Sequence, residues 1–208
     1  MSSLLILGAS GHGKSVLDCA LSTRAFTDIA FAVDYGCTGI HGYPVVGTLG
    51  DLARLREMYD CAVVAIGDND FRLRMTKKLS ELGYRLPPLI HRTAYVSPFA
   101  QIGPGSVVLA NSSVNTDAQL GMACIVNTNA SVDHDCTVGD GVHLSPNSVL
   151  CGTVHVGERS WICAGATVID HITIGSEVIV GAGAVVLRDL PDNSKVYGVP
   201  ARIPQTNR

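Results

Sequence analysis

From Val96 onward, every sixth residue is Val, Ile or Leu, and this pattern continues without interruption through sixteen blocks of six residues. If about a third of residues were of these three types, sixteen in a row would have a negligible probability by chance. The fifth residue of a block is mostly small, as at Ala100, Ser106, Ser112, Ala118, Cys124, Ala130, Cys136 and Ser148. Such a strict period indicates a solenoid, in which each unit buries its apolar residue only by stacking on its neighbours.

A second period, of 18 residues, is superimposed on the first. Glycine directly follows the aliphatic residue at positions 103, 121, 139, 157 and 175. One turn of the solenoid therefore consists of three blocks, and side chains 18 residues apart should stack, as Val138 would between Leu120 and Val156. At the spacing of β-strands, residues 96–191 would form about five turns, on the order of 25 Å tall.

Residues 1–86 follow a different pattern, an alternation of apolar runs and amphipathic segments. We expect strands at 4–7, 29–33 and 61–66, and helices at 14–21, 51–59 and 70–82. This order predicts a small α/β domain with a parallel, Rossmann-like sheet. Leu86-Pro87-Pro88 marks its end. The expected organisation is a domain at 1–86, a linker at 87–95, the repeat domain at 96–191 and a tail at 192–208.

The stretch GASGHGKS at residues 8–15 fits the phosphate-binding loop of ATPases and GTPases letter for letter. Such enzymes need a larger sheet and an acidic residue at the tip of a second strand to hold magnesium. Here the strand at 61–66 is followed by Gly67-Asp68. We therefore favour a glycine-rich turn whose backbone N–H groups approach a diphosphate at a helix N-terminus.

Composition excludes several classes of function. The formal charge is −3 and the pI is near 6.1, so we expect no nucleic-acid or membrane partner. No leader sequence and no apolar stretch of roughly 18–20 residues is found, and we expect a soluble, cytoplasmic protein. The number of cysteines, seven, is odd, and no C-x-x-C motif occurs. Both observations argue against a disulfide framework or a thiolate zinc site, and we expect the cysteines to be small buried residues.

The strongest candidate for chemistry is VDHDC at residues 132–136. His134 is the third residue of its block, where a side chain can leave the solenoid surface, and Gly152, 18 residues later, should leave open space above it. A neutral imidazole with a pKa near 7 can act as a general base. The alternative is a histidine with no role beyond a satisfied surface or core position.

The repeat, the tail VYGVPARI at 196–203 and the opening GASGHGK together resemble a known family. It is the family of bacterial sugar acyltransferases typified by sialic acid O-acetyltransferase and the UDP-4-amino-sugar N-acetyltransferases. The resemblance covers essentially the whole chain. It implies a left-handed parallel β-helix, a homotrimer, acetyl-CoA as co-substrate and no metal.

The resemblance also implies roles for individual residues. His134 matches the family's general base, Asp135 would orient its ring, and Asn127 matches a position near the catalytic histidine. Asp135 is one methylene shorter than the glutamate frequent in the family, which predicts an altered geometry or a bridging water. The residues that match acetyl-CoA contacts are His143, Ala164 and Ala182. Trp161 lies 18 residues after His143, where it would border the donor site or a subunit contact.

The positions that match the family's nucleotide-sugar contacts lie in the first domain. They are Ser10, Gly11 and His12 in the glycine-rich turn, Asp34 after the second strand and Gly67 after the third. Tyr35 occupies the place of a second acidic residue that is common in the family. For Asp34, the alternative is an ordinary turn residue at a strand end.

We therefore expect an enzyme that transfers an acetyl group from acetyl-CoA to the amine of a nucleotide-linked 4-amino sugar, in bacterial surface polysaccharide or glycan biosynthesis. The substrates would meet at His134 in a cleft between adjacent subunits. The first alternative is O-acetylation of sialic acid or another sugar hydroxyl. The others are a zinc-dependent carbonic anhydrase using His143, His155 and His171, and a non-catalytic scaffold.

Overall fold

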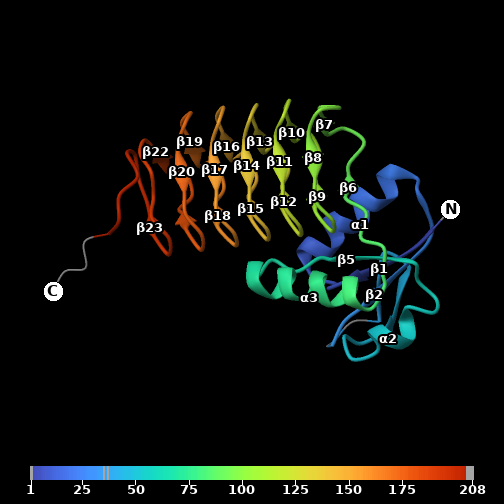
Figure 1. The fold of residues 1–208 in the computed structure, drawn as a ribbon. Coiled ribbons are helices and arrows are strands. Elements are labelled where there is room, and N and C mark those ends of the chain that lie inside the picture. Colours follow the sequence, from blue (N-terminus) through green and yellow to red (C-terminus); the bar gives the residue numbers. More distant parts are fainter. Residues whose placement is uncertain (1, 35, 37, 205–208) are drawn as a thin grey trace.

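The computed structural model describes residues 2–34, 36 and 38–204; Tyr35 and Cys37 therefore lie outside the described residues. A small α/β domain packs against the first turns of a long parallel β-helix, and the last strands of the chain lie at the opposite end of that β-helix (Figure 1). Among the residues described, no helix combines the length and the apolar character needed to cross a membrane.

The N-terminal domain is built on a sheet with strand order β3-β4-β2-β1-β5. Its strands are β1 (Ser2–Leu7), β2 (Phe26–Ala32), β3 (Gly39–Ile40), β4 (Tyr43–Gly47) and β5 (Cys61–Val64), and its helices are α1 (Gly11–Thr23), α2 (Leu52–Leu55) and α3 (Asn69–Glu81). Strand β1 pairs in parallel with β2 and β5, so the predicted parallel sheet is confirmed.

Two features of this domain differ from the sequence-based expectation. The helix expected at 51–59 is limited to α2, because the amides of Glu57 and Met58 bond to carbonyls only three residues back and tighten the chain. The hairpin of β3 and β4 was not predicted. Its two turn residues, His41 and Gly42, both have positive φ, as a tight hairpin turn requires.

The β-helix has three parallel sheets, which we number in chain order. Sheet 1 contains β6 (Leu89–Ile90), β9 (Val107–Val108), β12 (Ile125–Val126), β15 (His143–Leu144), β18 (Trp161–Ile162), β21 (Ile179–Val180) and β23 (Lys195–Val196). Sheet 2 contains β7 (Tyr95–Val96), β10 (Ser113–Val114), β13 (Ser131–Val132), β16 (Val149–Leu150), β19 (Thr167–Val168) and β22 (Val185–Val186). Sheet 3 contains β8 (Gln101–Ile102), β11 (Gln119–Leu120), β14 (Thr137–Val138), β17 (His155–Val156) and β20 (Thr173–Ile174).

The interior of the β-helix follows the predicted stacking. Val138 is paired in register with Leu120 on one side and Val156 on the other, and all three side chains are buried. Most corners turn at the fourth residue of a block, which adopts a left-handed backbone conformation. Glycine, asparagine and aspartate tolerate that conformation best, and several corners use them.

The β-helix extends beyond the segment expected from the repeat. Strand β6 lies within residues 87–95, which we expected to be a linker, and pairs with β9 through Leu89 and Val107. The reason is that Ile90 is in phase with the six-residue period, one block before Val96. At the other end, β23 lies within the expected tail and pairs with β21. The paired residues, such as Ile179 and Lys195, are 16 positions apart instead of the usual 18.

Replacing Leu144 with alanine should lower the free energy of unfolding by about 2–5 kcal/mol. Leu144 is 1% exposed and stacks between Val126 and Ile162, so truncation leaves a cavity that the rigid ladder cannot fill. Denaturant unfolding followed by circular dichroism measures the change. Thr137→Ala, at an exposed position of β14, should change the free energy of unfolding by less than about 0.5 kcal/mol. Equal effects of the Leu144 and Thr137 variants would contradict the assignment of inward and outward faces.

Six cysteines lie within the described residues, and all six are free thiols. Cys19, Cys61, Cys124 and Cys136 are buried, and two others are partly buried. Burial raises the pKa of the Cys19 thiol to about 12. These buried cysteines therefore pack as small apolar side chains, as predicted from the number and spacing of the cysteines in the sequence.

Candidate active site

His134 lies at the corner between β13 and β14, and its side chain is exposed. Its Nδ1 is 2.8 Å from Oδ2 of Asp135. Because a carboxylate only accepts hydrogen bonds, neutral His134 carries its proton on Nδ1 and its lone pair on Nε2. Asp133 accepts the backbone N–H of His134 at 2.8 Å and a hydrogen bond from Asn115 at 2.9 Å. The hydrogen bond to Asp135 raises the pKa of His134, so this ring is a stronger base than a free histidine.

The position of Asp135 follows from the corner geometry. As the fourth residue of its block it has φ +59°, the conformation in which a short aspartate side chain is favoured. This places the carboxylate against the ring of the preceding residue. The bridging water or altered geometry that the shorter side chain led us to expect is not needed, because Asp135 reaches His134 directly.

Gly152, one turn above His134, has a different role from the one expected. A Cβ added at Gly152 would lie 2.5 Å from Cε1 and 2.6 Å from Nε2 of His134. The space is therefore filled by the imidazole itself. The glycine allows the ring to lie across the next turn of the β-helix, with its orientation fixed on one edge by Asp135.

A second polar cluster lies on sheet 1, where Asn127 follows β12 and His143 begins β15. The Asn127 amide is oriented by its own loop, because Oδ1 accepts the backbone N–H of Thr128 at 2.9 Å. Its Nδ2 is then the donor to Nε2 of His143 at 3.3 Å. Burial, followed by the charges of Arg72 and His12, lowers the pKa of His143 to about 3. His143 is therefore neutral, with its proton on Nδ1.

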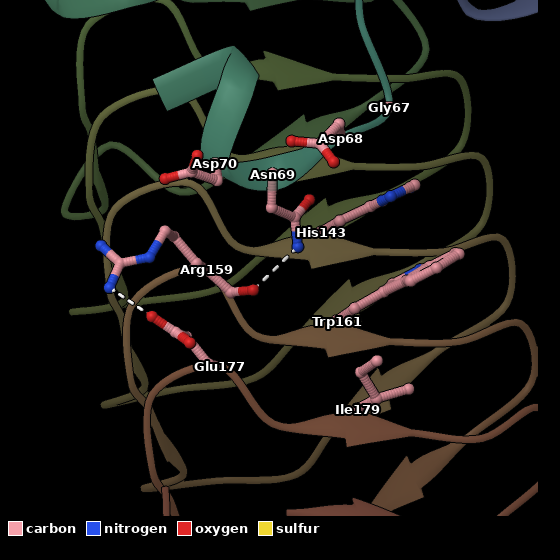
Figure 2. A pocket seen from close by; sticks show the side chains of 9 residues that line it. All are labelled: Gly67, Asp68, Asn69, Asp70, His143, Arg159, Trp161, Glu177 and Ile179. Atoms are coloured by element: carbon pink, nitrogen blue, oxygen red, sulfur yellow. Dashed lines mark hydrogen bonds and ion pairs between the residues drawn. The ribbon is translucent and has the colours of Figure 1, made fainter. Parts of the chain in front are cut away.

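Trp161 stacks on His143, with ring centroids 5.7 Å apart and planes inclined by 6°. Its indole Nε1 donates to Oγ of Ser145 at 2.7 Å, and 42% of the residue remains exposed. The two rings form one wall of a pocket of about 650 Å³ (Figure 2). The other lining residues are Gly67, Asp68, Asn69, Asp70, Arg159, Glu177 and Ile179.

The glycine-rich turn is shorter than a phosphate-binding loop of the ATPase type. Helix α1 already begins at Gly11, so only residues 8–10 form the loop. Gly8 has φ +106°, and a Cβ on Gly13 would collide with the carbonyl oxygen of Gly8. These two glycines bring strand, turn and helix into close contact, and the N-terminus of α1 is left facing outward at the exposed residues Ser10 and Gly11.

A second pocket, of about 560 Å³, lies beside this turn and is lined in part by Ser10, Asp34 and Ile66. Oδ1 of Asp34 accepts the backbone N–H of Leu49 at 2.9 Å, so the carboxylate both holds a loop and lines the pocket. Gly67, the residue after Ile66, lines the first pocket instead. The turn at Ile66 and Gly67 therefore separates the two pockets.

His12 is half-buried in the first turn of α1. Burial, with the nearby charge of Arg72, lowers the pKa of His12 to about 4. Like His143, it is therefore a neutral ring near the contact between the two domains.

Arg72 was not identified from the sequence. The local feature that could have identified it is a cation on the buried face of α3, beside Leu73 and Thr76.

Within one chain, the predicted site residues form separate groups. His134 and Asp135 lie at the corner between sheets 2 and 3, whereas Asn127, directly after β12 of sheet 1, contacts His143 of β15 in the same sheet. Ala164 and Ala182 are exposed at the corner between sheets 1 and 2 and lie on successive turns, where the amide of Gly183 donates to the carbonyl of Ala164.

The three histidines considered for a zinc site do not meet. His143 lies in sheet 1, His155 in sheet 3 and His171 at a corner. In the described part of the chain, no three His, Cys, Asp or Glu side chains are placed to hold a metal ion. Within one chain, the residues that the structure describes therefore supply no zinc site of the kind that a carbonic anhydrase would need.

Comparisons with known proteins agree with this architecture. Residues 3–79 match the PglD N-terminal domain, and residues 153–188 match the bacterial transferase hexapeptide repeat. The acetyltransferase domain of PglB from Neisseria gonorrhoeae FA1090, solved with acetyl coenzyme A, is 41% identical with a TM-score of 0.95, over 98% of this chain and 99% of that one. This chain belongs to the PglD family of hexapeptide-repeat sugar acetyltransferases. The membership confirms the resemblance, the left-handed β-helix and the enzyme class expected from the sequence.

Other members of the PglD family extend the comparison. A histidine-to-asparagine mutant of perosamine N-acetyltransferase from Caulobacter crescentus, in complex with CoA and GDP-perosamine, is 40% identical with a TM-score of 0.95, over 99% of this chain and 98% of that one. WeeI from Acinetobacter baumannii AYE is 26% identical with a TM-score of 0.89, over 98% of this chain and all of that one. The co-substrate expected from the sequence is thus the one bound in the Neisseria structure.

Proposed function

We propose that this enzyme transfers the acetyl group of acetyl-CoA to the amine of a nucleotide-linked 4-amino sugar, with His134 as general base. The observation that carries the proposal is the His134–Asp135 pair, which leaves Nε2 as an exposed acceptor on a rigid corner. The similarity to perosamine N-acetyltransferase favours an amine over a sugar hydroxyl as acceptor. The product would serve bacterial surface polysaccharide or glycan biosynthesis.

The chemical step needs one group that accepts and returns a proton. The amine nitrogen attacks the thioester carbonyl carbon, a C–N bond forms, and Nε2 of His134 takes the proton that the nitrogen must lose. The C–S bond then breaks, and the imidazolium returns the proton to the departing thiolate of CoA. Asp135 stabilises the imidazolium in between, as the third member of a catalytic triad does.

The acceptor would bind along the N-terminal domain. The outward-facing start of α1 offers backbone N–H groups and a favourable helix dipole to a diphosphate at Ser10 and Gly11. Asp34 and Gly67 line the adjoining pockets, where they would contact the nucleoside and the sugar. His12 lies beneath this surface and would support it as a neutral ring.

The donor would bind along the β-helix, against His143 and the backbone at Ala164 and Ala182. Small residues at this corner allow a pantetheine arm to lie close to the main chain. Because His134 lies at a different corner of the same chain, we propose a homotrimer in which His134 of one subunit meets the sheet 1 surface of its neighbour. Acetyl-CoA and nucleotide sugars are cytoplasmic metabolites, so the reaction would be cytoplasmic.

The test is release of the CoA thiol from acetyl-CoA in the presence of UDP-, GDP- and dTDP-linked 4-amino sugars or free sialic acid. Rapid release with one nucleotide-linked amino sugar is the expected result and identifies the nucleotide. Release with sialic acid alone would mean O-acetylation instead. Release that is abolished by a chelator and restored by zinc would contradict a mechanism carried by His134 alone.

A further inference from the structure

Arg72 of α3 is the largest polar side chain in the buried interior, with 1% of its surface exposed. Burial lowers its pKa to about 10, so the guanidinium remains charged at neutral pH. It makes five hydrogen bonds, as many as a guanidinium has N–H groups. Every acceptor is neutral: four are main-chain carbonyls and one is a side-chain amide oxygen. A buried cation is tolerated only where other groups replace its hydration, and here five hydrogen bonds do so.

The hydrogen bonds of Arg72 join two parts of the chain. Nη1 donates to the carbonyls of Ile66 and Gly67, at 3.1 and 3.2 Å. Nε donates to Ala123 at 2.8 Å and Nη2 to Gly141 at 2.7 Å. The first two acceptors belong to the turn between the two pockets, and the last two are corner residues on successive turns of the β-helix.

Asn69 extends the same connection by one more turn. Its Oδ1 accepts from Nη2 of Arg72 at 2.9 Å, and its Nδ2 donates to the carbonyls of Arg159 and Ser160 at 2.9 and 3.2 Å. Arg159 is the corner residue that follows Gly141 by 18 positions. Figure 1 shows α3 lying alongside the β-helix, and Figure 2 shows Asn69 beside Arg159 at the edge of the first pocket.

We infer that Arg72 is a positioning residue that holds the turn at Ile66 and Gly67, and with it the acceptor substrate, in register with the β-helix. This inference rests on the proposed function. The β-helix is rigid through its own ladder of hydrogen bonds, whereas the turn follows the last strand of a small domain. The planar fork of arginine offers five N–H groups on three separate nitrogens, so it can bond to all of these acceptors at once, whereas lysine has three N–H groups on one nitrogen.

The variant Arg72→Lys keeps the charge but has only three N–H groups, so at least two of the five hydrogen bonds are lost. We expect the KM for the nucleotide sugar to rise about tenfold and the KM for acetyl-CoA to stay within about twofold. Lys77→Met, which removes an exposed cation from the same helix, should leave both values unchanged. A purely structural role would lower the melting temperature and leave both KM values as they are, and that result would overturn the inference.

Hydrogen–deuterium exchange gives a readout that does not depend on catalysis. In Arg72→Lys, the amides of residues 66–72 should exchange at least about tenfold faster, while those of β15 and β18 keep their protection. Unchanged exchange at 66–72 would also overturn the inference. If the wild-type enzyme acetylates no nucleotide-linked amino sugar, the proposed function fails, and the exchange measurement alone decides whether Arg72 holds the turn. Arg72→Met serves as a second variant if it folds, with a larger effect of the same kind.

Discussion

Replacing His134 with alanine should lower kcat for acetyl transfer by about 10³-fold, within the range by which a general base accelerates a reaction. Nε2 of His134 is the group that would take the proton from the attacking amine, and water cannot occupy its place in the same fixed orientation. The exposed ring contributes little packing, so the variant should fold normally. Steady-state release of the CoA thiol measures kcat, and circular dichroism measures the fold.

A matched control is His155→Ala, which removes another exposed histidine of the β-helix, on sheet 3. Its activity should remain within about twofold of the wild type, as expected for a surface residue. Near-normal turnover in the His134 variant would show that another group takes the proton. An equal loss in both variants would point to general damage to the β-helix.

The pH dependence of kcat/KM tests the His134–Asp135 pair. The general base must be neutral, so kcat/KM should fall as pH drops through the pKa of His134, which its hydrogen bond to Asp135 raises. Asp135→Asn removes the charge that stabilises the imidazolium, so this pKa falls. The acidic limb of the profile should therefore move to lower pH, while the maximum rate decreases. If the limb does not move, it belongs to the acceptor amine.

Replacing Gly152 with valine should lower kcat by roughly 10²-fold, because a displacement of about 1 Å at a catalytic group can cost that much. Any Cβ at this position meets the imidazole within 2.6 Å, so the ring must rotate away from Asp135. The backbone of Gly152 does not have the positive φ found at the corners. The variant should therefore fold, with its effect confined to the neighbouring histidine.

A double-mutant cycle separates this steric effect from other causes. Gly152→Val should cause no further loss of activity in a His134→Ala background, since the ring that it displaces is already absent. Additive losses would show that valine disturbs the acetyl-CoA site or the subunit contact instead. The cycle requires only the residual rates of the four proteins, measured at saturating concentrations of both substrates.

Sequence and structure contributed different parts of the candidate site. The chemical identity of His134 and Asp135 was evident from VDHDC and the resemblance, but their direct hydrogen bond was not, because it depends on the left-handed backbone at the corner. Asn127 was expected near the catalytic histidine, and within one chain it bonds to His143. Gly152 was expected to leave open space, and the imidazole fills it.

The sequence by itself determined the β-helix, since the periods of six and 18 residues describe contacts between each turn and the next. Those contacts are nearly identical at every level, so a pattern can record them. Only the tertiary structure decided how the first domain sits on the β-helix. That contact combines the apolar packing of α1 on Leu89 and Val107 with the hydrogen bonds of Arg72 and Asn69, which reach residues 51 to 91 positions away. Such contacts occur once in the fold, and a contact that occurs once leaves no period in the sequence.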